Sequence, residues 1–94
     1  MLTYKAAYKL VEDVYLGEVL DFPGTVSFGY TMDEVRRNLA GALHDMAETN
    51  LLRGEALPLP DANRSDPDAD LEEPIHLAIQ TGQYVSVNIA AAMP

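Results

Sequence analysis

Acidic side chains dominate the chemistry that this sequence can offer. The 94 residues carry fifteen Asp and Glu against six Lys and Arg, which gives a formal net charge of −9, and they include two histidines and no cysteine. Carboxylates bind divalent cations and support hydrolysis when several of them converge on one point. Most acids of this chain lie instead in expected turns and in one acidic stretch, so the sequence does not favour a metal-dependent nuclease site.

The histidines and one Asp-rich stretch are the other candidates for chemistry. His44 and Glu48 lie one helical turn apart, but no second pair of this kind accompanies them, which favours a solvated helix face. His76 is expected to be an ordinary half-exposed strand residue. Asp66-Pro67-Asp68-Ala69-Asp70 begins like a calcium loop, yet Leu71 stands where that loop needs glycine. The sequence therefore predicts no catalytic residue, no cofactor and no metal site.

Strands and one helix must position whatever these residues do. Apolar alternation and turn signals predict strands over residues 2–11, 14–20, 25–28, 75–79 and 84–89. The Asp21-Phe22-Pro23-Gly24 stretch is a turn. This order predicts an α+β domain, βββαβ with one possible extra strand, in which one helix packs on one face of an antiparallel sheet.

A capping box marks the start of the single long helix. The Thr31 hydroxyl is expected to accept from the Glu34 N–H while the Glu34 carboxylate accepts from the Thr31 N–H. Arg53-Gly54 supplies a basic last turn and a stop. Gly41, in mid-helix, is expected to mark close packing on the sheet. The apolar positions recur at helical spacing: Val35, Leu39, Ala42, Leu43, Met46 and Ala47.

Composition divides the single domain into three parts. Residues 1–60 form the β-β-β-α core, residues 61–73 form an acidic mobile loop, and residues 74–94 complete the domain with one or two strands. One helix covers one face only, and the strand over 14–20 is apolar on both faces, which predicts a homo-oligomer, a dimer or higher. Phe28 is expected to hold the sheet together. No apolar run is long enough to cross a membrane, which favours the cytoplasm.

Residues 4–60 resemble the HicB family of antitoxins. The shared features are a Tyr-rich first strand, a strand running into Asp-x-Pro-Gly, a short strand ending in Gly, a Thr-x-x-Glu helix start with Asn and Ala-Leu further along, and a Pro-x-Pro segment at 58–60. The residues that carry the pattern are Asp21, Pro23, Gly24, Gly29, Thr31, Glu34, Asn38, Ala42 and Leu43.

The resemblance implies a partial ribonuclease-H-like fold without nuclease activity. It also implies a type II antitoxin that binds and neutralises HicA, a small basic toxin that cleaves mRNA. The acids expected to face this partner are Asp66, Asp68, Asp70, Glu72 and Glu73. Direct DNA binding is not expected, because no DNA-binding helices follow the strand over 85–89. A stand-alone regulatory or scaffold domain of the same fold is the alternative, and a residual nuclease ranks third.

Overall fold

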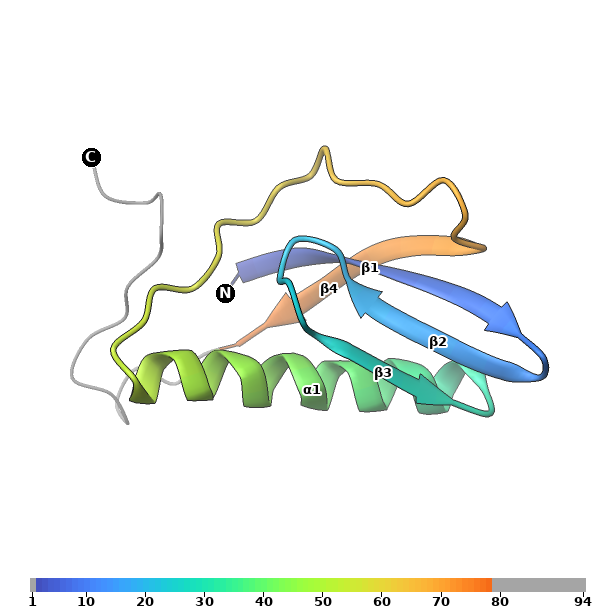
Figure 1. Cartoon of the computed structure of the whole chain (residues 1–94), viewed down its shortest axis with the longest axis horizontal. Helices are drawn as coiled ribbons and strands as arrows, with labels where there is room; N and C mark the ends of the chain where they lie inside the picture. The colour runs from blue at the N-terminus through green and yellow to red at the C-terminus, as the bar shows by residue number, and fades with distance from the viewer. Residues whose placement is uncertain (1, 79–94) are drawn as a thin grey trace.

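The computed structural model describes residues 2–78 of the chain. Its elements are four strands and one helix: β1 (Leu2–Val11), β2 (Val14–Val19), β3 (Val26–Gly29), α1 (Met32–Leu52) and β4 (Leu71–Leu77). All strand pairs are antiparallel in the order β3-β2-β1-β4, and α1 lies along one face of the sheet (Figure 1). The predicted α+β, βββαβ fold is confirmed. The strand expected over 84–89 lies outside the described residues.

Alternation along the strands places the core between the sheet and α1. On β1, Tyr4, Ala6 and Tyr8 face the helix and are buried. The side chains that α1 buries recur every three or four residues: Val35, Leu39, Leu43 and Ala47. Ala42 and Met46, which share this predicted stripe, are half-buried at its margin.

The two ends of α1 follow the predicted signals with two differences. The Thr31 hydroxyl accepts from the Glu34 N–H at 3.0 Å, as expected. The Glu34 carboxylate, however, accepts from the Tyr30 N–H at 3.1 Å, so the predicted bond to the Thr31 N–H is wrong. Arg53 is the C-cap and lies just beyond the last turn, which contains no basic residue, so the predicted basic last turn is wrong. Gly54 ends the helix with φ +72°, as predicted.

Close approach between helix and sheet involves different glycines from the predicted one. Gly41 is exposed, and a Cβ added there would meet nothing within 4 Å, so its predicted packing on the sheet is wrong. A Cβ at Gly29 would lie 2.6 Å from the Val35 nitrogen, and one at Gly17 would lie 3.1 to 3.2 Å from Val35, Leu39 and Tyr8. Gly17 and Gly29 therefore let α1 approach β2 and β3.

A buried carboxylate joins the turn after β2 to two distant segments. Asp21 is 5% exposed, and its two oxygens accept from the backbone N–H groups of Lys5 and Asp61, each at 2.8 Å. The turn itself closes with Gly24 at φ +88°. The segment that leaves α1 is thereby fixed against β1. The Tyr4 hydroxyl adds a bond to the Pro58 carbonyl at 2.7 Å.

The acidic segment differs from its predicted boundaries. Leu71, Glu72 and Glu73 pair with Tyr8, Ala7 and Ala6 of β1, so the predicted loop boundary at residue 73 is wrong and β4 begins four residues before the expected position 75. Charged partners explain why no apolar alternation marks this start. Glu73 accepts from two nitrogens of Arg36 on α1, at 2.8 and 3.2 Å. The mobility predicted for residues 61–70 stays a prediction.

Candidate partner-binding surface

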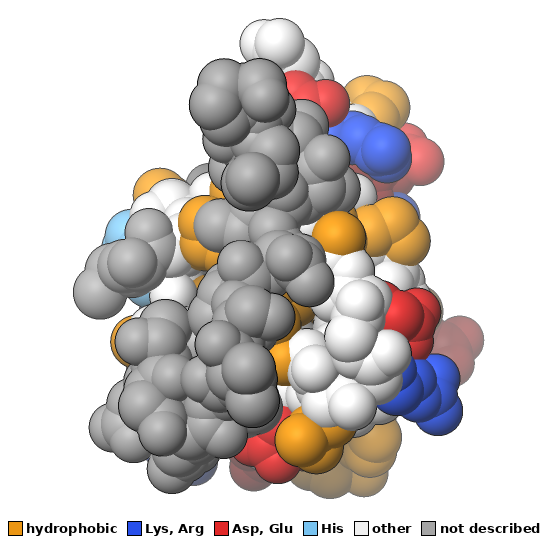
Figure 2. Space-filling view, turned by 90° about the vertical axis from the view of Figure 1, so that its left-hand side faces the viewer, with side chains coloured by type: hydrophobic (Ala, Val, Ile, Leu, Met, Phe, Trp, Pro, Cys, Tyr) orange, Lys and Arg blue, Asp and Glu red, His pale blue; other side chains and the backbone are white. Residues whose placement is uncertain are grey.

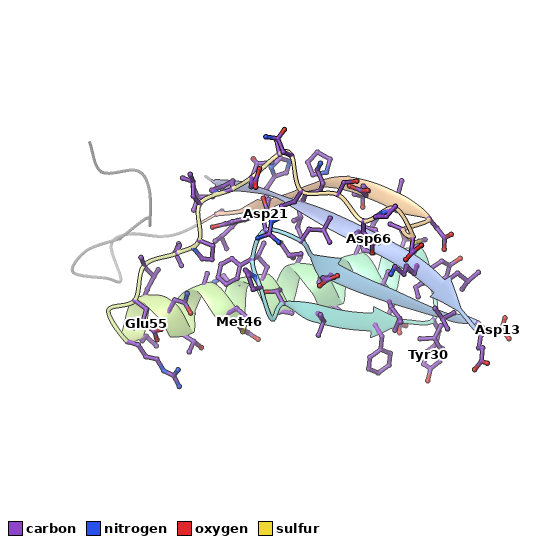
Figure 3. The ribbon with its side chains drawn as sticks, turned by 45° about the horizontal axis from the view of Figure 1, so that its top comes forward. Asp13, Asp21, Tyr30, Met46, Glu55 and Asp66 are labelled. Atoms are coloured by element: carbon purple, nitrogen blue, oxygen red, sulfur yellow. The ribbon has the colours of Figure 1, made fainter. Side chains whose placement is uncertain are left out.

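The face of the sheet opposite α1, which we call the outer face, is covered on one half. The segment of residues 61–70 crosses it over β1 (Figures 1 and 3). The Lys5 ammonium donates to the carbonyls of Ala62 and Arg64 at 2.7 and 2.8 Å, and the Lys9 ammonium lies 2.9 Å from Asp66. Ala7, between these two lysines, is only 4% exposed. Two lysines of one strand thus hold the segment over that half.

The other half of the outer face, over β2 and β3, is open and apolar. Register pairs Leu16 with Phe28 and Glu18 with Val26, so these side chains share the outer face. Leu16, Val26 and Phe28 are 43%, 62% and 56% exposed. The exposed ring of Tyr30 meets Phe28 edge to face, with centroids 6.4 Å apart. We call Leu16, Val26, Phe28 and Tyr30 the outer patch.

A shallow groove separates the outer patch from the covering segment. It has a volume of about 430 Å³, and its lining includes Leu16, Val26 and Phe28 on one side and Lys9 and Asp66 on the other. The hydrogen bond between the last two raises the pKa of Lys9 and lowers the pKa of Asp66. This cation is therefore matched by its own anion, and Glu18 adds a further negative charge to the rim.

The molecule looks different at the end where α1 finishes. There the described side chains in view are of mixed kinds, with acidic and basic groups next to each other (Figure 2). Leu52 is exposed near this end, at the last position of the helix. The outer patch, in contrast, brings four large apolar side chains from β2, β3 and the residue that follows them onto one surface. Contiguous apolar surface of this kind indicates a binding site.

The acids predicted to face a partner do not form one cluster. Asp70 accepts from the Leu10 N–H at 2.7 Å, and Glu72 accepts from the Ser65 hydroxyl at 2.9 Å. Glu73 lies on the helix side, paired with Arg36. Asp66 forms an ion pair with Lys9. Of these five acids, Asp68 is the one whose side chain has no hydrogen bond or ion pair with residues 2–78. Most of these acids therefore hold the chain's own segment in place.

The residues of the family pattern build the turn, the short strand and the helix start beneath the outer patch. Asp21 and Gly24 shape the turn, Gly29 admits α1, and Thr31 and Glu34 cap it, as described above. Asn38 donates its side-chain amide to the Phe28 carbonyl at 2.9 Å and so ties α1 to β3. Of the remaining three, Leu43 is fully buried, Ala42 half-buried and Pro23 exposed.

Sequence reasoning predicted apolar surface on the sheet face that the helix leaves uncovered, but it did not place Val26, Phe28 or Tyr30 there. Phe28, expected to hold the sheet together, points away from the core, and that expectation is wrong. The usable signal was parity: Phe28 lies one residue before Gly29, which faces α1, so Phe28 must face outward. The apolar residues on both faces of the second strand gave the same hint through Leu16.

The candidate metal ligands stay apart. Among residues 2–78, no group of three or more His, Asp and Glu side chains could hold a metal ion. The exposed His44 imidazole lies 3.9 Å from Glu48 and 3.8 Å from Asp45. The His76 ring lies 3.0 Å from the Thr3 hydroxyl. The stretch that begins like a calcium loop continues into β4, whose pairing with β1 leaves no loop to wrap an ion.

Over residues 2–78, the sheet order and the covering helix define the class of this protein, a four-stranded α+β domain whose outer sheet face is open over β2 and β3. The model of the UPF0150-like family matches residues 3–58, more than half of the chain, and the chain belongs to this family. A comparison with curated protein sequences finds no match. Within the described residues, no helix combines the length and the apolar character needed to cross a membrane.

Two solved structures share the fold. The N-terminal domain of antitoxin HicB from Burkholderia pseudomallei is 22% identical, with a TM-score of 0.71 over 83% of this chain and 100% of that one. A structure of antitoxin HicB from the same organism is 24% identical, with a TM-score of 0.70 over 100% of this chain and 75% of that one. The HicB-like resemblance predicted from the sequence is confirmed at the level of the fold.

Proposed function

We propose that this protein is the antitoxin of a type II toxin–antitoxin pair, which binds and neutralises a basic HicA-type mRNA-cleaving toxin in the cytoplasm and performs no catalysis itself. The observation that carries the proposal is the outer patch on an acidic chain whose fold is that of the HicB antitoxins. A stand-alone scaffold domain remains the alternative.

Two properties of the chain support masking of a basic enzyme. Leu16, Val26 and Phe28 offer apolar area that a partner would remove from water, which is the main favourable term in most protein association. The net charge of −9 attracts a basic partner from a distance and orients it on approach. Affinity is then expected to depend on the outer patch, and the association rate on the acids.

Self-association belongs to the same proposal. A second copy could cover part of the outer patch when no toxin is present, which would make the protein a homo-oligomer in the free state. The charge of −9 on each copy opposes this contact, so any oligomer should grow stronger as salt screens the repulsion. Light scattering of the free protein at two salt concentrations measures it.

The decisive experiment mixes the purified protein with a small basic protein of the HicA type. We expect a complex at micromolar concentration and suppressed RNA cleavage. Phe28→Ser should weaken the complex about tenfold or more, because aromatic side chains often dominate binding energy. Leu52→Ser is the matched control, since Leu52 is 71% exposed at the far end of α1. No complex, or a complex that cleaves RNA undiminished, contradicts the antitoxin function.

A further inference from the structure

The two edge strands of the sheet differ in how they meet solvent. On β1, the Lys5 N–H donates to Asp21 and the Lys5 carbonyl accepts from the Leu20 N–H, so both backbone groups of Lys5 point toward β2. Lys5 and its partner Pro74 on β4 are therefore not hydrogen-bonded to each other. The nitrogen of Pro74 accordingly faces the open edge, where proline offers no donor. Proline at such a position protects an edge strand from pairing with another chain.

The edge of β3 has no such protection. The Val19 N–H donates to the Thr25 carbonyl at 2.9 Å, which by alternation turns the backbone groups of Val26 and Phe28 away from β2. Asn38 occupies the Phe28 carbonyl. Among residues 2–78, the Val26 N–H and carbonyl and the Phe28 N–H have no hydrogen-bond partner. β3 reads Val-Ser-Phe-Gly, without charge or proline.

The helix leaves room beside this open edge. Asn38 of α1 lies beside Phe28, to whose carbonyl it donates. Eight residues further along α1, the Met46 side chain lies 3.6 Å from a Cβ built on Gly24. The middle of this stretch of α1, at residues 41–42, therefore lies beside Val26, which is midway between Gly24 and Phe28. Gly41 has open space around its Cα. Glycine in mid-helix is unfavourable relative to alanine, and no contact within the described chain accounts for it here.

The charge on the side of α1 next to the β3 edge indicates which kind of strand could pair with that edge. Asp45 follows Asn38 by seven residues, which places both on one side of α1. Its side chain is 87% exposed, and the ion pair it has within the described chain is a 3.8 Å contact with His44. A second copy would bring another such carboxylate and another −9 charge to the edge. A strand that carries Lys or Arg would instead be attracted.

We propose that the open edge of β3 pairs with a strand of the basic toxin. The added strand bonds to the backbone of Val26 and Phe28 and sets apolar side chains on the outer patch. Its alternate side chains, Lys or Arg, pass over Gly41 toward Asp45. This is β-augmentation, in which main-chain bonds supply affinity and alternate side chains supply specificity. The inference rests on the proposed antitoxin function and names the site and chemistry of its partner.

Amide hydrogen exchange in the complex of this protein with a small basic HicA-type protein tests the edge directly. We expect the exchange rates of the Val26 and Phe28 amides to be about tenfold lower, or lower still, in the complex than in the free protein. A hydrogen-bonded amide must open before it exchanges. The Glu72 and His76 amides, which face the β4 edge, should keep their rates. A complex in which the Val26 and Phe28 amides exchange as fast as before overturns the edge pairing and leaves the antitoxin function standing.

A matched pair of helix variants provides the second test. Gly41→Gln places a long neutral side chain in the path of the added strand, while Ala40→Gln makes a similar change at the exposed neighbour, about 100° around the helix. We expect Gly41→Gln to weaken the complex about tenfold and Ala40→Gln to leave it unchanged, with both variants folded as judged by circular dichroism. Equal affinities contradict the proposal.

Three further outcomes have defined meanings. If wild-type protein forms no complex, the antitoxin function fails and the inference fails with it. If the Val26 and Phe28 amides are already protected in a free protein whose mass is that of a dimer, the edge belongs to a second copy and the toxin strand is overturned. A monomeric free protein in which both amides exchange rapidly supports the proposal.

Discussion

The two faces of this sheet carry apolar side chains with different consequences. On the helix face, Tyr4 and Tyr8 are 2% and 3% exposed and pack against Leu39 and its neighbours. On the outer face, Leu16 and Phe28 remain about half exposed. Hydrophobic stabilisation follows the area removed from water, so the first set holds the fold, whereas the second set leaves about half of its area in contact with water. Substitutions of apolar residues on the helix face should therefore mainly lower stability, whereas those on the outer face should mainly weaken binding.

The largest contrast comes from two leucines. Leu39→Ala should lower the free energy of unfolding by about 2–5 kcal/mol, because it leaves a cavity at a fully buried site. Leu16→Ala should lower it by about 0.5 kcal/mol, as at other surface positions, yet weaken the toxin complex. Urea denaturation followed by circular dichroism measures both. Equal costs would mean that the outer patch belongs to the core.

Alkaline pH separates the faces in a second way. Burial, and next the negative charge of Asp21 for Tyr4 or Glu73 for Tyr8, raises the pKa of each tyrosine from 10.0 to about 12. The folded protein thus holds protons that the unfolded chain has released, so stability is full below pH 10 and falls as the pH rises toward 12. The slope should approach about 1.4 kcal/mol per pH unit for each tyrosine.

The check is urea denaturation at several pH values between 9 and 12. Tyr8→Phe should make the decline in stability distinctly shallower, because one of the two protons is no longer lost on unfolding. A Tyr8→Phe variant whose stability falls as steeply as that of the wild type would show that the hydroxyl already reaches solvent in the folded protein.

A smaller effect concerns one polar group buried on the helix side. The Thr25 hydroxyl is fully buried and has no hydrogen-bond partner within the described residues. Thr25→Val replaces that hydroxyl with a methyl group of similar shape and should raise the free energy of unfolding by about 1 kcal/mol. Thr49→Val on the exposed surface of α1 is the control and should change it little. Destabilisation by Thr25→Val would indicate a buried water or an undetected acceptor.

The smallest effect concerns the cover on the outer face. Asp66→Asn removes the carboxylate that pairs with Lys9 and accepts from the Asp68 N–H at 2.9 Å. Because the pKa of Asp66 is lowered, its contribution is full above the ordinary value of 3.8 and is lost as the pH falls through the lower value of the folded protein. Faster amide exchange at Asp68 is the expected result.

Asp68→Asn is the matched control, since this variant leaves the Lys9–Asp66 pair in place. Its amide should exchange as in the wild type. Identical exchange in both variants would mean that the pair does not order the segment, in line with the mobility predicted for residues 61–70.

Local signals made the helix the most predictable element. Thr31 and Glu34 act three residues apart at one end of the helix, and Gly54 acts on the turn just before it at the other end. The helical spacing of Val35 and Leu39 likewise needs no knowledge of distant parts of the chain. The first three strands followed from alternation and turns in the same way, with ends within a residue of those observed. Interactions between residues that are close in the chain can therefore be predicted from the sequence.

The start of β4 and the surface sites depended on long-range partners. Glu73 joins the sheet because Arg36, 37 residues earlier, meets its carboxylate, and an acidic stretch without that partner looks like a loop. Asp66, predicted to face a toxin, lies in the segment of residues 61–70 and forms an ion pair with Lys9 of β1, 57 residues earlier in the chain. Phe28 was assigned to the wrong role because an exposed Phe28 and a buried one are identical in a sequence, and its face follows from the parity and register of β3, which the structure supplies.

The carboxylate of Asp21 has a consequence for the order in which the chain assembles. Its two oxygens accept from the backbone N–H groups of Lys5 and Asp61, which lie 16 and 40 residues away in the chain, so the two hydrogen bonds close loops of these lengths. The shorter loop needs only the first hairpin, whereas the longer one requires α1 to have formed and returned the chain to the sheet, and closing it costs more entropy. The covering segment should therefore dock last during folding, because its anchor is complete only when both the hairpin and the helix are in place.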